Sequence, residues 1–332
     1  MNAYMLTARL LALLVLLSEP DTLSAQAAPP INQCRTNWVL STVQDMNFGA
    51  FSADAGVATI TMNRFGGRTP SGQVSLSTSI PATAWVVDVN NTLDPACASY
   101  GFTLDLRRAP RPLRGTGSDI PLGNIRVTVP AYGLNDVTFP QLIVPGPGNT
   151  APFTMTIYGE ITVTNPQTSG LYGRNLAVRI TQNNRNHRAR TRVQATSIVP
   201  LSIAEITVMD FGTIAGGLVP GTVVLGVGNS RIASGDVQLL TSGMATVASF
   251  QVTGEPGQAY SISFNNGLLT NAGGDQMSAG SFTSNSSGAI PAGGSELFQI
   301  GATLSVGSNQ PAGNYSTTNA GGAPYTVTVN YN

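Results

Sequence analysis

The feature that most constrains this chain is a long internal repeat. The segment Ile157–Tyr172 aligns on Ile300–Tyr315 without a gap, at a constant offset of 143 residues. The motif Met46–Gly49 recurs as Met209–Gly212 at an offset of 163, so the first unit holds about twenty residues more than the second. Solenoid repeats are shorter, at roughly 20 to 50 residues. The sequence therefore predicts tandem domains.

Each unit is predicted to be a β-sandwich. Short runs in which apolar and polar residues alternate recur every eight to fifteen residues, with Gly and Pro between them, and no long stretch shows helical periodicity. The last run places apolar side chains at every second position: Tyr325, Val327, Val329 and Tyr331. Because this spacing is typical of antiparallel sandwiches, the expected fold class is all-β, with two tandem immunoglobulin-like antiparallel β-sandwiches.

Composition along the chain predicts the domain boundaries. Residues 1–27 are expected to be a signal peptide, because Leu10–Leu17 forms a short apolar run that a small-residue cleavage site follows. A membrane span needs about 20 apolar residues, so no transmembrane anchor is expected. The first sandwich is assigned to residues 28–181, with an Arg/Pro-rich insertion at 107–147. A basic linker is assigned to 182–196 and the second sandwich to 197–332.

The two cysteines, Cys34 and Cys97, both lie in the first unit. An even number of cysteines in a secreted chain favours a disulfide, and we expect these two to form one. A zinc site is a poor alternative, because two thiols and the single distant histidine, His187, cannot complete a tetrahedral shell. No metal and no cofactor is expected.

Several motifs carry a resemblance to a known group. These are Phe48–Gly49 and its copy Phe211–Gly212, the turn Gln310–Tyr315 and the terminal VTVNY. The chain resembles bacterial surface families related to spore coat protein U and to the subunits of chaperone-usher pili, in particular a domain of unknown function in envelope proteins of Gram-negative bacteria, present here in two copies. The match is best over Ser197–Asn332 and weaker over the first unit. The resemblance implies pilin-like sandwiches, export to the periplasm and then to the cell surface or fimbria, and a structural or adhesive role.

The resemblance also implies partners. Pilus subunits lack one strand and are completed by an extension from a neighbour, so a periplasmic chaperone, an usher and other subunits are implied. Tyr325, Val327, Val329 and Tyr331 are similar to the alternating ending that such chaperones hold. The same alternation also suits the closing strand of a complete sandwich, and both interpretations stay open.

The expected position in a fibre follows from the segment before Cys34. The mature tail there is about six residues long, which is short for a donated strand, so a two-domain adhesin at a fibre tip, with a surface polysaccharide as receptor, is the leading hypothesis. A self-contained envelope or extracellular matrix coat protein is the alternative.

The sequence predicts no enzyme. It holds no lysine, which excludes a P-loop, and no Gly-x-Ser-x-Gly, His-Glu-x-x-His or Cys-x-x-Cys motif. The sole histidine, His187, lies among arginines that should lower its pKa, which makes it a poor catalytic base.

Two arginine clusters remain without an assigned role. One comprises Arg107, Arg108, Arg111 and Arg114, and the other spans Arg185 to Arg192. Such side chains bind anionic polysaccharide, lipopolysaccharide phosphates or DNA through charge-assisted bonds. Aromatic residues do not interleave with them, so no nucleic-acid partner is expected. A solvated loop and a solvated linker are the default interpretation.

Overall fold

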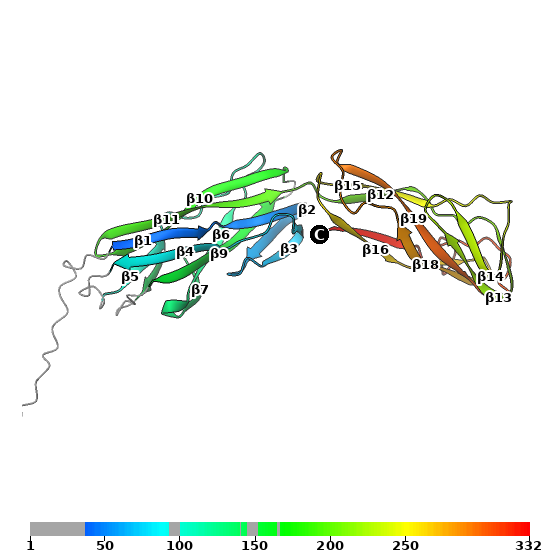
Figure 1. The fold of residues 1–332 in the computed structure, drawn as a ribbon, viewed down its shortest axis with the longest axis horizontal. Helices are drawn as coiled ribbons and strands as arrows, with labels where there is room; N and C mark the ends of the chain where they lie inside the picture. Colours follow the sequence, from blue (N-terminus) through cyan, green and yellow to red (C-terminus); the bar gives the residue numbers. More distant parts are fainter. Residues whose placement is uncertain (1–36, 93–99, 140, 145–151, 165–166) are drawn as a thin grey trace, which may run out of the picture.

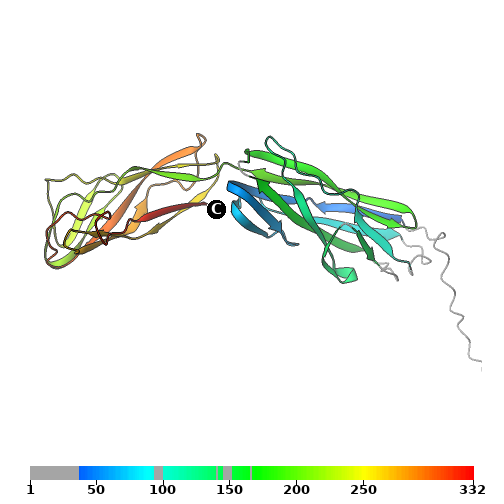
Figure 2. The same ribbon diagram turned by 180° about the vertical axis from the view of Figure 1, so that it is seen from behind.

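The computed structural model describes residues 37–92, 100–139, 141–144, 152–164 and 167–332. The predicted signal peptide and both cysteines lie outside these residues, so the disulfide between Cys34 and Cys97 stays a prediction. The described chain consists of strands and loops, with a single turn of 3-10 helix at Pro130–Tyr132, which confirms the expected all-β class. Two β-sandwiches lie end to end, and the chain ends at the junction between them (Figures 1 and 2).

The first sandwich is built from one large curled sheet. Its strand order is β1-β4-β9-β2-β11-β10-β5-β8, with β3, β6 and β7 attached at the sides. Large apolar side chains such as Trp85, Phe48 and Phe51 are fully buried between the layers. The strands are β1 (Asn37–Gln44), β2 (Asn47–Met62), β3 (Arg68–Ser77), β4 (Trp85–Thr92), β5 (Phe102–Leu106), β6 (Leu122–Val129), β7 (Leu134–Thr138), β8 (Gln141–Val144), β9 (Phe153–Thr164), β10 (Gly170–Gln182) and β11 (Arg185–Ser197).

The predicted linker at 182–196 is wrong. Residues Gly170–Ser197 form a long antiparallel hairpin, β10–β11, in continuous register. The hairpin turns at Asn183 and Asn184, which both have positive φ, as a tight turn between antiparallel strands requires. The buried face of β11 carries small residues such as Ala189 and Ala195, and its exposed face carries arginines. Because the buried residues are small, the alternation of apolar and polar residues is weak in the sequence. The segment therefore resembles a polar linker.

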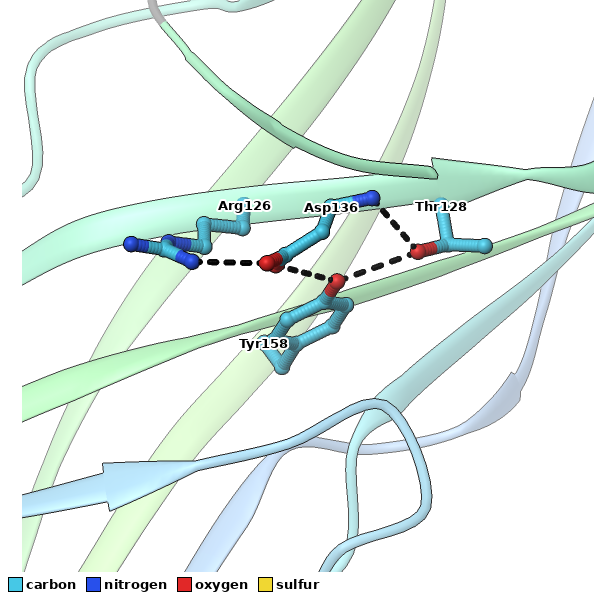
Figure 3. A network of polar contacts seen from close by, with 4 residues as sticks. All are labelled: Arg126, Thr128, Asp136 and Tyr158. Atoms are coloured by element: carbon cyan, nitrogen blue, oxygen red, sulfur yellow. Dashed lines mark hydrogen bonds and ion pairs between the residues drawn. The ribbon is translucent and has the colours of Figure 1, made fainter. Parts of the chain in front are cut away.

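The Arg/Pro-rich insertion contains more structure than its sequence indicates. Only Ile125–Val129 is predicted there as a strand, whereas the structure places β6, β7 and β8 within it. Four side chains fasten β6 and β7 to β9 (Figure 3). The Tyr158 hydroxyl donates to Asp136 at 2.8 Å and lies 3.0 Å from the Thr128 hydroxyl. Arg126 donates to the same carboxylate at 2.8 Å.

Tyr158→Phe should lower the free energy of unfolding by about 1 to 2 kcal/mol, because it leaves the buried Thr128 hydroxyl short of a partner. The exposed ion pair matters less, so Arg126→Met should cost under about 1 kcal/mol. Burial raises the pKa of Tyr158 in the folded state. The wild type should therefore lose this stability as pH rises above about 10, whereas Tyr158→Phe should not. Urea unfolding of all three chains across this pH range checks both points, and equal midpoints for wild type and Tyr158→Phe would contradict them.

The second sandwich is built from two separate sheets. The larger has the order β12-β15-β19-β13-β14, with β18 on β19 and β17 on β18, and the smaller is the pair β16–β20. The strands are β12 (Ser202–Thr207), β13 (Ile214–Leu225), β14 (Arg231–Leu239), β15 (Ala248–Thr253), β16 (Tyr260–Asn265), β17 (Gly267–Thr270), β18 (Gln276–Ser284), β19 (Ser295–Val306) and β20 (Thr326–Tyr331).

An arginine holds the same backbone groups in both sandwiches. Arg68 donates to the carbonyl oxygens of Phe48, Ala50 and Ser77. Arg231 donates to those of Phe211, Thr213 and Leu240, and each of these residues lies 163 positions after its counterpart. The two units therefore share this contact as well as the sequence motif, at the offset that the motif defines.

The glycine of the repeated motif has a positive φ in each unit, at 71° for Gly49 and 70° for Gly212. A side chain at Gly49 would place its Cβ 2.6 Å from the Ile80 carbonyl oxygen, and one at Gly212 would place it 2.8 Å from that of Gly243. Only glycine fits such a backbone at such a distance. The side chain two residues earlier accepts a hydrogen bond from the glycine N–H in each unit. Asn47 accepts from Gly49 at 2.8 Å, and Asp210 accepts from Gly212 at 2.7 Å.

The junction between the sandwiches is packed around Tyr331. Its ring lies in a small apolar cluster with Ala50 and Ile198 of the first sandwich. Its hydroxyl donates to the Val199 carbonyl at 2.6 Å and accepts from the Glu255 N–H at 2.7 Å. Next to it, the Thr78 N–H donates to the Asn332 carbonyl at 2.8 Å. These contacts tie the end of β20 to the first sandwich.

Candidate functional site

The candidate site is the outer edge of β20 together with the groove beside it. Among the described residues, β20 pairs with β16 alone. The Asn332 N–H donates to the Ala259 carbonyl at 3.1 Å, which fixes the phase of this antiparallel ladder. Hydrogen-bonded pairs alternate in such a ladder, so the backbone N–H and C=O groups of Val327 and Val329 point away from β16. The edge therefore offers a row of backbone donors and acceptors to a further strand.

In the first sandwich, a strand covers the edge that corresponds to the outer edge of β20. β10 of the first sandwich corresponds to β20 of the second. β10 pairs antiparallel with β5, and β20 pairs antiparallel with β16. The other edge of β10 is covered by β11, which also pairs in parallel with β2. In the part of the second sandwich that the structure describes, no strand takes the place of β11, either beside β20 or beside β13, the counterpart of β2.

Side-chain burial shows the consequence. The inward residues of β10 opposite β5, Val178 and Ile180, have 0% exposure. Those of β20 opposite β16, Val327 and Val329, are only half-buried. The partner strands differ in the same way: Phe102, Leu104 and Leu106 of β5 are buried, and Ile262 and Phe264 of β16 are half-buried. The second sandwich thus exposes apolar surface that the first one covers.

A groove with a volume of about 1110 Å³ lies beside Tyr325, the residue that precedes β20. It is lined by the segment 207–216, which leads into β13, and by Tyr315 and Tyr325. Its apolar lining also comprises Met209, Phe211, Ile214, Leu269, Met277, Leu304 and Val306. In the first sandwich the corresponding entry to β2 is bonded to β11, through Gln194 N–H to the Met46 carbonyl at 3.0 Å. The groove therefore corresponds in position to the place where β11 meets the entry to β2 in the first sandwich, and it lies next to the beginning of β20.

Two tyrosines of the second sandwich donate to carboxylates, and one of them, Tyr325, lines the groove. Tyr325 donates to Glu205 of β12 at 2.8 Å and packs on Phe282 at 5.5 Å between ring centroids. Burial, together with the carboxylate, raises the pKa of Tyr325. Tyr260 donates to Glu296, and burial and this bond raise the pKa of Tyr260 to about 12. Both hydroxyls therefore stay protonated at neutral pH and donate to their carboxylates.

The four residues predicted as a contact strand divide into two groups. Tyr325 lines the groove, whereas Val327 and Val329 are half-buried and pack against the core of the second sandwich. Tyr331 is buried at the junction, where its hydroxyl bonds to Val199 and Glu255. The sequence identifies the strand, but it cannot show that its last aromatic residue binds the neighbouring sandwich.

The predicted arginine cluster is also divided. Arg107, Arg108 and Arg111 line one hollow on the first sandwich together with arginines of β10 and β11. Arg114 instead forms an ion pair with Asp119, at 3.6 Å.

The single histidine, His187, lies in β11 opposite Ile180, and burial lowers its pKa. Among the described residues, no group of three or more His, Cys, Asp or Glu side chains gathers in a way that could hold a metal ion. No helix in the described ranges is long and apolar enough to cross a bilayer.

Comparison with known proteins gives one family match. Residues 201–331, which include β12 to β20, match the family model described as Domain of unknown function (DUF4402). No curated protein matches the chain.

Among solved structures, the chain is similar to a chaperone–tip adhesion subunit pre-assembly complex, CsuC-CsuE, from archaic chaperone-usher Csu pili of Acinetobacter baumannii. The identity is 12% and the TM-score 0.25, over 88% of this chain and 100% of that chain. A second structure, BspA_C_mut, has 9% identity and a TM-score of 0.23, over 76% of this chain and 90% of that chain. Both TM-scores are too low to establish a common fold.

Proposed function

We propose that this chain is a non-enzymatic subunit of a surface fibre of pilus type, whose second sandwich is completed by an extended strand from another subunit. The observation that carries the proposal is the difference between the two sandwiches. The first one is closed by β11, and the described part of the second contains no equivalent strand.

The physics of an open edge supports this proposal. An unpaired strand edge beside exposed apolar side chains promotes aggregation unless a strand covers it. Strand addition supplies backbone hydrogen bonds for affinity, and alternate side chains that enter the groove supply specificity. β11 shows the kind of strand that fits, with Ala189, Val193 and Ala195 facing inward. The occupant is thus an extended segment with small or medium apolar residues at every second position, antiparallel to β20.

The proposal extends to the route and to the position in the fibre. An exported subunit with an open groove needs a protective partner before assembly, and a periplasmic chaperone that lends a strand would fill that role. The first sandwich needs no donated strand and is free to face a receptor. The layout therefore suits a two-domain adhesin that is carried to the cell surface on its second sandwich.

The test is assembly on cells that carry an epitope-tagged chain. Val327→Asp with Val329→Asp should remove the chain from sheared fibres, because two carboxylates would then lie on the half-buried inward face of β20 that a donated strand covers. Thr328→Asp is the matched control, since Thr328 lies on the same strand with its side chain exposed, and it should assemble like the wild type. The unfolding of each purified chain shows whether its sandwiches are folded.

Recovery of the wild type as a monomer in the envelope, with no fibre fraction, would contradict the proposal and favour a self-contained coat protein. Equal assembly of the three chains would show that the groove is not used.

A further inference from the structure

The first sandwich carries a strongly basic hollow on its surface, far in sequence from the groove. It has a volume of about 550 Å³ and is lined by six arginines: Arg107, Arg108, Arg111, Arg174, Arg190 and Arg192. The remaining lining consists of small, aliphatic and amide residues, including Ala177, Leu122 and Asn175. No acidic side chain is among the lining residues.

Strand pairing brings the two arginine clusters together. The Arg107 N–H donates to the Ala177 carbonyl at 2.9 Å, on one side of β10. On the other side, β11 places Arg190 opposite Ala177 and Arg192 opposite Asn175. Ala177 is small, so the side chains from both sides have room above it. The clusters are therefore walls of one site, although about eighty residues separate them in the sequence.

The charge of this hollow is not balanced by the protein. None of the six arginines forms an ion pair with an acidic side chain in the described part of the chain. The nearby Asp105 is already bound by Arg179 through two bonds, at 2.9 and 2.5 Å. Neighbouring positive charges, that of Arg188 first, lower the pKa of Arg107. Arginine nevertheless stays charged in proteins, so the site keeps a mutual repulsion that a bound anion would relieve.

We propose that this hollow binds an acidic polysaccharide through the carboxylate or sulfate groups of consecutive sugars. Guanidinium groups bind such planar or tetrahedral anions with two parallel hydrogen bonds. The aliphatic and amide residues between the arginines suit the uncharged parts of a sugar ring. The inference goes beyond the proposed assembly role and does not depend on the second sandwich.

The shape and composition of the hollow argue against nucleic acid. Single strands bind to aromatic platforms on which bases stack, and no aromatic residue lines the hollow. Duplex DNA is read by a protruding helix or β-ribbon that enters a groove, whereas this site is concave.

Binding is tested by calorimetry on the whole mature chain with four probes: a heparin hexasaccharide, an oligogalacturonate, neutral dextran and a 12-nucleotide single-stranded DNA. The two acidic oligosaccharides should bind, more weakly as salt rises, and dextran should not. Arg107→Ser with Arg190→Ser should weaken their binding at least about tenfold, which is 1.4 kcal/mol.

The matched control is Arg64→Ser with Arg185→Ser, which removes the same charge from exposed positions outside the hollow; its affinity should stay within about twofold of the wild type. If the first variant does not fold, Arg108→Ser with Arg111→Ser replaces exposed side chains of the same site. Equal losses in the hollow and control variants, no binding of either acidic oligosaccharide, or tighter binding of DNA would each overturn the proposal.

Discussion

A chain extended beyond Asn332 by a short Gly/Ser linker and a copy of the Arg185–Ser197 strand should unfold with a more stable second sandwich. The added strand can pair with the edge of β20 and cover the half-buried residues Val327, Val329 and Ile262. Full burial of one such side chain contributes about 1.5 to 3 kcal/mol. Because several of them become covered, we expect a gain of about 3 kcal/mol or more, seen by calorimetry as a shift of one of two transitions.

The control carries the same extension with the inward residues of the copied strand changed to Asp, at the positions that copy Ala189, Thr191, Val193 and Ala195. Carboxylates cannot enter an apolar groove without a large desolvation cost, so this chain should unfold like the wild type. If both extensions shift the transition equally, the gain does not come from the groove. If neither shifts it, the second sandwich does not accept a strand of this kind.

Arg68→Met should destabilise the first sandwich by about 3 to 5 kcal/mol. The half-buried guanidinium satisfies three backbone carbonyl groups, at 3.0, 2.7 and 2.6 Å, and a hydrogen bond to a charged group contributes about 1.5 to 3 kcal/mol. Arg231→Met should destabilise the second sandwich less, because the corresponding distances are longer, at 3.1, 3.4 and 3.1 Å. Urea unfolding of both variants measures which of them loses more unfolding free energy.

Arg64→Met is the control for the loss of one arginine. Arg64 is exposed and contacts only the ring of the exposed Phe65, at 4.7 Å from its centroid, among the contacts that the described chain shows for it. Its replacement should cost under about 1 kcal/mol. An equal cost for Arg64→Met and Arg68→Met would show that the three carbonyl contacts do not stabilise the fold.

The sequence predicts those parts of the fold that repeat or alternate strongly. Alternating apolar runs with Gly and Pro between them predict the all-β class, and the repeated motif locates two glycines, Gly49 and Gly212, that both have a positive φ. The sequence also contains a signal for the arginine that binds the same carbonyl groups in both units. Arg68 is followed by Ser71, Gly72 and Val74, and Arg231 by Ser234, Gly235 and Val237, at the same offset of 163.

The remaining features depend on pairings between distant segments. The strand β11 is hidden because its inward residues are small and its outward residues are charged, which resembles a linker. The basic hollow exists only because β5 and β11 pair with opposite edges of β10. In the described part of the chain no strand covers the outer edge of β20, and this open edge becomes visible only when the two sandwiches are compared in three dimensions.

The most direct test of the open groove is hydrogen exchange of the backbone amides of β20, followed residue by residue in the isolated chain. We expect fast and slow exchange to alternate along β20. Val327 and Val329, whose N–H groups face the open edge, should exchange fast, whereas Thr328 and Asn330, whose N–H groups face β16, should exchange slowly. Val178 and Ile180 of β10, which have neighbours on both sides, should both be slow. Equal and strong protection of all four β20 amides would mean that the edge is already covered, and it would contradict the claim that the second sandwich awaits a strand.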